Sequence, residues 1–209
     1  AANFQTDKIN FSELYGGFRK IITTQTTFDD FQQNDFLQNT FGEIFPNQFV
    51  LFCQNEEDED GLIARYSVEN DTIYPLKFYT GQEIFGITAK NQEQMMAFDL
   101  LLDPDVKLVS LVGKAGTGKT LIALAAGLNQ VVEENNYSRL VVSRPVSPLG
   151  KDIGYLPGSK AEKFNPWMQP IFDNMEMLLS VKNDTDENEN SKIFGKKRPL
   201  LEDYLDFGF

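Results

Sequence analysis

One short stretch of this sequence combines residues that could bind phosphate groups, Gly113-Lys-Ala-Gly-Thr-Gly-Lys-Thr120. It fits the pattern of glycine, four residues and Gly-Lys-Thr/Ser, in which glycine lets backbone N–H groups turn inward around the phosphates of a nucleotide. We expect Lys119 to reach the β- and γ-phosphates, and the Thr120 hydroxyl to bind the Mg²⁺ that bridges their oxygens. The predicted site consists of Gly113, Lys114, Ala115, Gly116, Thr117, Gly118, Lys119, Thr120 and Leu121.

The segments on either side are those that such a loop requires. Residues 107–112 form a short apolar run rich in β-branched residues, which is typical of a buried parallel strand. Residues 120–134 have the length and composition of a helix. The loop would therefore lie at a helix N-terminus, where the backbone dipole and free N–H groups favour an anion. This order of elements argues against a chance match of the glycine pattern.

A glutamine upstream of the loop has two possible roles. Near residue 87 the spacing between apolar residues changes from two to about 3.6 positions, which predicts an amphipathic helix up to Leu102. Asn91 is a plausible N-cap, and Gln94, three residues on, would complete a capping arrangement. Alternatively, the Gln94 amide could read adenine, because it pairs with a base edge as donor and acceptor together. Spacing alone does not decide between these roles.

A second buried strand is expected at residues 138–143, followed by a loop rich in proline and glycine at residues 144–158. Functional residues gather in loops at the carboxyl ends of parallel strands. Residues 139–163 hold 5 basic residues, Arg144 and Lys151 among them, against 2 acidic ones. Both contact with phosphate groups and simple solvation of a surface loop are compatible with these charges.

The first part of the chain predicts a different architecture. Segments of strand length lie at residues 48–54, 62–68, 72–78 and 83–87, separated by turn residues, and suggest a small antiparallel sheet or barrel. The acidic run 56–61 favours a solvated hairpin loop over a cation site, because it lacks the ligand spacing of a calcium loop. In the preceding forty-odd residues a helical turn at residues 11–15 and a strand at residues 18–24 are possible, but these signals are weak and we expect irregular structure. Cys53, the single cysteine, is expected to be a buried small hydrophobe.

Composition excludes several classes of function. A net charge of −12 argues against a protein that coats nucleic acid non-specifically. The absence of histidine excludes a histidine base and histidine metal ligands in this sequence. No apolar run approaches the ~20 residues of a membrane span, and the N-terminus does not resemble a signal peptide. A cytoplasmic protein without a membrane partner is the expectation.

Three stretches resemble the PhoH-like family of P-loop ATPases, in the form fused to a PIN nuclease domain, with the PIN domain absent from this chain. They are residues 90–94 (Lys-Asn-Gln-Glu-Gln), the loop 113–120, and Ser143-Arg-Pro-Val146 continuing through Gly150–Gly158. The resemblance implies an α/β fold: an incomplete P-loop NTPase parallel sheet, related to superfamily 1 helicases, preceded by a small β-rich domain. The implied domains are a connector at residues 1–86 and the N-terminal part of the ATPase at residues 87–209.

The resemblance also implies a function: binding and hydrolysis of ATP with Mg²⁺, coupled to RNA remodelling or unwinding in a homo-oligomeric ring. By position, Gln94 would face adenine, and Arg144 would lie in a loop that contacts nucleic acid. However, no apolar strand ending in Asp-Glu follows residue 120. We therefore name no catalytic residue, and expect a segment of a longer enzyme that binds ATP but hydrolyses it poorly.

Three other functions compete with this one. A nucleotide-stabilised assembly module without motor activity is the alternative that stays open. A small-molecule kinase would need an acceptor pocket and a lid, which the linker-like first part does not fit. A GTP-dependent switch is disfavoured because the guanine-reading Asn-Lys-x-Asp does not occur.

Overall fold

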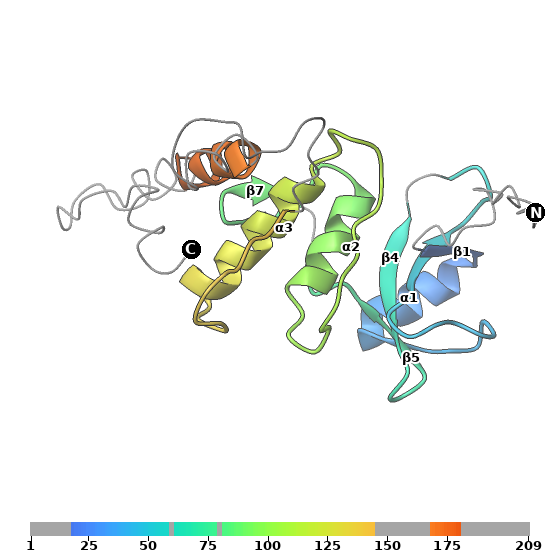
Figure 1. Ribbon diagram of the computed structural model, residues 1–209. Helices are drawn as coiled ribbons and strands as arrows, with labels where there is room; N and C mark the ends of the chain where they lie inside the picture. Colours follow the sequence, from blue (N-terminus) through green and yellow to red (C-terminus); the bar gives the residue numbers. More distant parts are fainter. Residues whose placement is uncertain (1–17, 59–60, 79–80, 145–167, 181–209) are drawn as a thin grey trace, which may run out of the picture. The chain divides into compact units, whose positions relative to one another are not determined.

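The computed structural model describes residues 18–58, 61–78, 81–144 and 168–180 (Figure 1). The chain divides into two compact units, Ala1–Lys77 and Phe78–Phe209. This division falls at residue 78, whereas the change of periodicity in the sequence lies near residue 87. Each unit is described by itself below.

The first unit contains a five-stranded mixed sheet with the strand order β1-β3-β4-β5-β2. Strand β1 pairs in parallel with β3, and the other neighbours pair antiparallel. The strands expected at residues 48–54, 62–68 and 72–78 form as β3, β4 and β5. The elements of this unit are β1 (Phe18–Ile22), α1 (Gln25–Asn34), β2 (Leu37–Gln38), β3 (Phe49–Cys53), β4 (Leu62–Ser67) and β5 (Thr72–Pro75).

The expectation of irregular structure before residue 40 is wrong for the residues that the structure describes there. β1, α1 and β2 occupy this region, and the signal was weak because α1 is rich in Gln, Asp, Asn and Thr. Its position depends on tertiary contacts: Phe31 is 3% exposed, and its ring lies 6.3 Å from that of Phe52 on β3. Burial of one aromatic face thus outweighs the poor helix propensity of the neighbouring residues.

Strand β3 is the most buried strand of the first unit, since all five of its residues are buried. Around it lies a cluster of buried side chains from several elements: Phe31, Ile44, Val50, Phe52, Ala64, Tyr66 and Ile73. Cys53 is 1% exposed, and burial raises the pKa of its thiol. The expectation that it is a buried small hydrophobe is confirmed.

The described part of the acidic run, Glu56–Asp58, belongs to the connection between β3 and β4. Lys20 on β1 donates from Nζ to the backbone oxygens of Glu56, at 2.5 Å, and Asp58. Glu56 and Glu57 are exposed, as expected for a solvated loop. Within the described ranges, no group of three Cys, Asp or Glu residues could hold a metal ion.

The described residues of the second unit form helices and one short hairpin. Its elements are β6 (Glu83–Ile84), β7 (Ile87–Thr88), α2 (Gln92–Leu101), α3 (Lys119–Leu128), the π-helix η2 (Asn129–Glu133) and a helix over residues 168–180. The segment expected as one strand at 83–87 therefore turns back on itself. Phe85 (φ 47°) and Gly86 (φ 80°) both have positive φ, as a two-residue hairpin turn requires.

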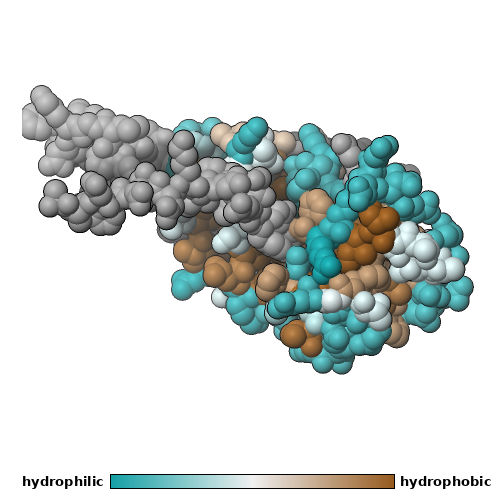
Figure 2. All heavy atoms as spheres, turned by 90° about the vertical axis from the view of Figure 1, so that its right-hand side faces the viewer, coloured by the Kyte–Doolittle hydropathy of each residue, from teal (hydrophilic) through white to brown (hydrophobic). Residues whose placement is uncertain are grey.

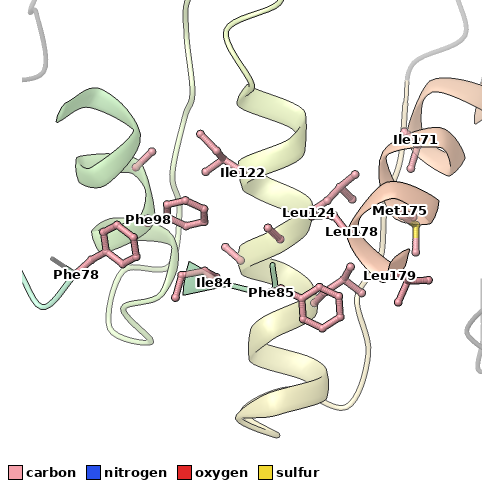
Figure 3. Packing of buried hydrophobic residues seen from close by; sticks show 14 residues of the cluster. Phe78, Ile84, Phe85, Phe98, Ile122, Leu124, Ile171, Met175, Leu178 and Leu179 are labelled. Atoms are coloured by element: carbon pink, nitrogen blue, oxygen red, sulfur yellow. The ribbon is translucent and has the colours of Figure 1, made fainter. Parts of the chain in front are cut away.

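Helix α3 is the central element of this unit. Figure 3 shows α2 on one side of it and residues 168–180 on the other, with apolar side chains filling both contacts. Phe98 of α2 is fully buried beside Phe78, with ring centroids 5.1 Å apart. Met175 and Leu178 contribute to the same cluster from the other side. The helix expected at 120–134 is present as α3 with η2, and the helix expected from about residue 166 is described from 168.

The strands expected at residues 107–112 and 138–143 do not form, so the predicted parallel sheet is absent from the described residues of the second unit. Both segments keep the alternation of a strand. One face packs against the core through Leu111, Leu140 and Val142. Leu140 lies so close to Gly127 of α3 that a Cβ added to this glycine would be 2.7 Å from Leu140 Cδ1. The opposite face is open, with Leu108 85%, Val112 96% and Val141 72% exposed.

The physical reason for this difference is that a strand requires a hydrogen-bonded neighbour. Neither segment pairs with another described segment. The alternation of apolar residues in a sequence indicates which side chains prefer burial. It does not indicate whether a partner strand is present.

Figure 2 shows one face of the molecule, which is mainly hydrophilic with a few apolar patches. Among the described residues of the first unit, the exposed large apolar side chains are those of Ile22, Phe36, Phe45, Val68 and Tyr74. In the part of the chain that the structure describes, we find no helix with the length and apolar character needed to cross a bilayer.

Candidate phosphate-binding site

The loop before α3 owes its shape to glycine. Gly116 (φ 81°) and Gly118 (φ 84°) both have the left-handed backbone conformation that residues with a Cβ adopt at a cost. Gly118 is also the N-cap of α3, and the first helical bond runs from Ile122 N–H to the Gly118 oxygen, at 2.9 Å. The N–H groups of residues 119–121 therefore have no acceptor within the helix. They form a local site of positive potential beside the loop.

Lys119 folds back into this loop. Its ammonium donates to the Lys114 backbone oxygen at 2.5 Å and to Thr117 Oγ1 at 3.2 Å, while the Thr117 hydroxyl donates to the same Lys114 oxygen at 2.9 Å. Both of these acceptors of Lys119 are neutral oxygens, so neither neutralises its charge. Anionic phosphate oxygens would make stronger, charge-assisted bonds in their place. The residues present therefore fit a polyphosphate group.

The loop is open to solvent. Residues 113–117 are exposed, and a Cβ added to Gly116 would meet no atom within 4 Å. Thr120, next to Lys119, is exposed, and its role in binding Mg²⁺ stays a prediction. Leu121 is half-buried against the core, so its backbone N–H is the one group of this residue that could donate to an anion.

The structure places Gln94 at this loop and confirms the capping arrangement. Asn91 caps α2 by accepting from Gln94 N–H at 2.9 Å, and Gln94 Oε1 accepts from Lys90 N–H at 2.8 Å. In addition, Gln94 Nε2 donates to the Thr117 backbone oxygen at 3.4 Å. Sequence reasoning missed this contact, because no pattern in the sequence links residues 23 positions apart. The role of Gln94 in reading adenine stays a prediction.

The two residues expected to contact nucleic acid are not brought together by the described structure. Arg144 is exposed at the end of the extended segment that follows η2. Lys151 and the rest of the loop at residues 145–158 lie outside the described residues. The described site can therefore hold an anion, and it offers no group assigned to bond cleavage.

Comparison with known proteins identifies the family resemblance of the second unit. The sequence model described as "PhoH-like protein" matches residues 86–195. Protein PhoH2 of Bacillus subtilis (strain 168) is 44% identical over 191 residues, which are 87% of this chain and 42% of the relative. Protein PhoH2 of Mycolicibacterium smegmatis is 51% identical over 100 residues, 47% of this chain and 23% of the relative.

A third relative, Protein PhoH of Escherichia coli (strain K12), is 34% identical over 95 residues, which are 46% of this chain and 26% of the relative. The chain thus spans less than half the length of each of these three relatives. No solved structure was found to match.

Proposed function

Because this chain belongs to the PhoH-like protein family, we propose that it binds ATP together with Mg²⁺ through the loop Gly113–Thr120. Lys119 would hold the β- and γ-phosphates, backbone N–H groups of the loop and of the first turn of α3 would surround them, and Thr120 would ligate the ion. Bound ATP would supply the reactive γ-phosphoryl group.

The observation that carries this proposal is the position of the Lys119 ammonium. It lies inside an exposed, glycine-shaped loop, on the neutral oxygens of Lys114 and Thr117. A lysine that served only as a surface charge would extend into water and gain side-chain entropy. A cation held beside the N-terminus of a helix instead favours binding of an anionic ligand.

Hydrolysis and RNA remodelling form the second part of the proposal, for the longer protein. The sequence after Thr120 contains no apolar run that ends in Asp-Glu, so we assign the carboxylate that would position the attacking water to no residue of this chain. Exposed Arg144 supports contact with an RNA phosphate. Assembly into a ring is part of the same proposal.

One observation favours the alternative of a nucleotide-stabilised assembly module. The side chains of Leu108, Val112 and Val141 are each more than two-thirds exposed, although all three are apolar. Exposed apolar surface often marks an interaction site. In this case ATP would stabilise α3 and its loop, and the apolar surface would bind another polypeptide. ATP hydrolysis by the longer protein that does not respond to RNA would support this alternative.

The nucleotide proposal is tested by replacing Lys119. We expect Lys119→Ala to weaken binding of Mg²⁺·ATP by about tenfold to a hundredfold, the range for loss of charge-assisted hydrogen bonds, without lowering the melting temperature. Isothermal titration calorimetry of both proteins measures this. Lys107→Ala is the control, because it removes the same charge from an exposed residue outside the loop. Equal ATP affinity of Lys119→Ala and the unmodified chain would refute the assignment.

A further inference from the structure

Gln94 connects two segments that are distant in sequence. Through Lys90 and Asn91 it belongs to the N-terminal cap of α2, and through Nε2 it contacts the Thr117 backbone oxygen in the phosphate loop. Both side-chain polar atoms of Gln94 therefore bond to backbone groups, Oε1 to Lys90 just before the N-cap of α2 and Nε2 to Thr117 in the loop.

The orientation of the amide follows from these partners. The Lys90 N–H can pair only with an acceptor, so Oε1 faces Lys90, and the donor Nε2 faces the loop. On that side, Nε2 also lies 3.3 Å from where a Cβ of Gly118 would be. The amide thus donates to Thr117 and lies beside Gly118, the two residues that directly precede Lys119.

Helix α2 provides a rigid support for this contact. Met96 and Phe98, on the turn after Gln94, are 5% and 0% exposed, and Ala97 between them is also buried. The loop itself is exposed over residues 113–117, and the hydrogen bonds of Thr117 and Lys119 to the Lys114 oxygen join groups of the loop to one another and not to a packed element. A binding site is more precise when its residues are held by a packed element than when they lie on a free loop.

We propose that Gln94 is a positioning residue for the phosphate loop, which rests on the proposed function of that loop. By holding the Thr117 peptide against α2, the Gln94 side chain keeps the loop in the shape that accepts a polyphosphate. This role is separate from reading a base. Each polar atom of the amide retains further bonding capacity, since Nε2 carries a second hydrogen and Oε1 a second lone pair.

A ligand without a base separates the two roles. If Gln94 only read adenine, its loss would weaken binding of ATP and leave binding of inorganic tripolyphosphate unchanged. If Gln94 positions the loop, both ligands lose affinity by the same factor. Loss of one neutral hydrogen bond corresponds to about two- to tenfold weaker binding.

The experiment uses Gln94→Met, which keeps the length of the side chain and the backbone N–H that Asn91 caps, and removes both side-chain hydrogen bonds. Affinities for Mg²⁺·ATP and for sodium tripolyphosphate with MgCl₂ are measured by calorimetry, and melting temperatures verify that the variant folds. Gln92→Met is the matched control, since it makes the same change two residues earlier in the first turn of α2. A variant Gln94→Ala serves as a second test if the methionine packs in a new way.

A parallel loss of affinity for both ligands in the Gln94 variants, with Gln92→Met unchanged, would support the proposal. Weaker binding of ATP alone, or unchanged binding of both, would overturn it while leaving the phosphate site in place. If the unmodified chain binds neither ligand, the proposed function fails, and the role of Gln94 fails with it.

Discussion

At the scale of single residues, one carboxylate connects three segments of the first unit. Asp71 Oδ1 accepts hydrogen bonds from Tyr66 Oη at 2.7 Å and from Asn39 Nδ2 at 2.9 Å. These bonds, the one from Asn39 first, lower the pKa of Asp71. The hydrogen bond to Asp71 is in turn the main cause that raises the pKa of Tyr66. The charged carboxylate and the neutral phenol are thus the forms that the folded state favours.

This network predicts a pH dependence with two limits. Because the folded state lowers the pKa of Asp71, its contribution to stability is present above the unfolded value of about 4 and is lost as the pH falls through the lower folded value. Because the folded state raises the pKa of Tyr66, its contribution is present below about 10 and is lost as the pH rises through the higher folded value.

Between these two pH limits, Tyr66→Phe should therefore melt at a lower temperature than the unmodified chain. The difference in melting temperature should become smaller toward both the acidic and the basic limit. Thermal unfolding followed by circular dichroism across the pH range measures it. Tyr74→Phe is the control, since its hydroxyl has a 3.5 Å bond to the neutral Asn70 amide. A difference that stays constant from acid to base would mean that the Tyr66–Asp71 bond does not produce it.

At the scale of secondary-structure elements, the sequence predicts local elements better than their partners. The spacing of Asn91 and Gln94 places the start of α2, and α3 begins at Lys119, one residue before the expected start at residue 120. These starts depend on neighbouring residues, which a sequence displays directly. A strand depends on a partner from elsewhere in the chain, and for residues 107–112 the described structure supplies none. The same limit explains why α1, which is held by contacts of Phe31, was missed.

The open face of the extended segments leads to a prediction about apolar surface. Leu108 and Val112 are 85% and 96% exposed and lie four residues apart on the same face of one extended segment. A dye that fluoresces on exposed apolar surface, such as anilinonaphthalene sulfonate, should bind there. The double variant Leu108→Thr and Val112→Thr should lower the dye fluorescence and leave the melting temperature nearly unchanged, because few contacts are lost.

The control for this measurement is Val68→Thr, since Val68 is also exposed, at 61%, and lies in the first unit. It should change the fluorescence less than the double variant. Equal fluorescence of the double variant and the unmodified chain would show that the dye binds elsewhere and that these two side chains do not form an accessible apolar surface.

At the scale of the whole molecule, net charge limits how the proposed contact with RNA could form. The chain carries a net charge of −12, so contact with nucleic acid must depend on a few local cations. Arg144 is the one of the two predicted contacts that the structure describes, and it is exposed. Its place after the extended segment 138–143 was predictable, whereas its surroundings depend on residues 145–158, which are not described.

If Arg144 contacts an RNA phosphate, Arg144→Ala should weaken binding of a single-stranded oligouridine and lower the slope of log affinity against log salt by about one unit. Fluorescence anisotropy at several salt concentrations measures both. Arg139→Ala, which removes an equal charge from an exposed residue of the same segment, is the comparison. If the slope of log affinity against log salt is the same in Arg144→Ala as in the unmodified chain, Arg144 does not contact an RNA phosphate and its role is structural.

The most direct test of the central claim is to observe the backbone of the phosphate loop while ATP binds. We predict that titration with Mg²⁺·ATP shifts the amide nuclear magnetic resonances of Gly116, Thr117, Gly118 and Lys119, because their N–H groups would donate to phosphate oxygens. Amide resonances of the first unit should stay in place. If millimolar Mg²⁺·ATP leaves the resonances of residues 113–121 unchanged, this loop does not bind the nucleotide.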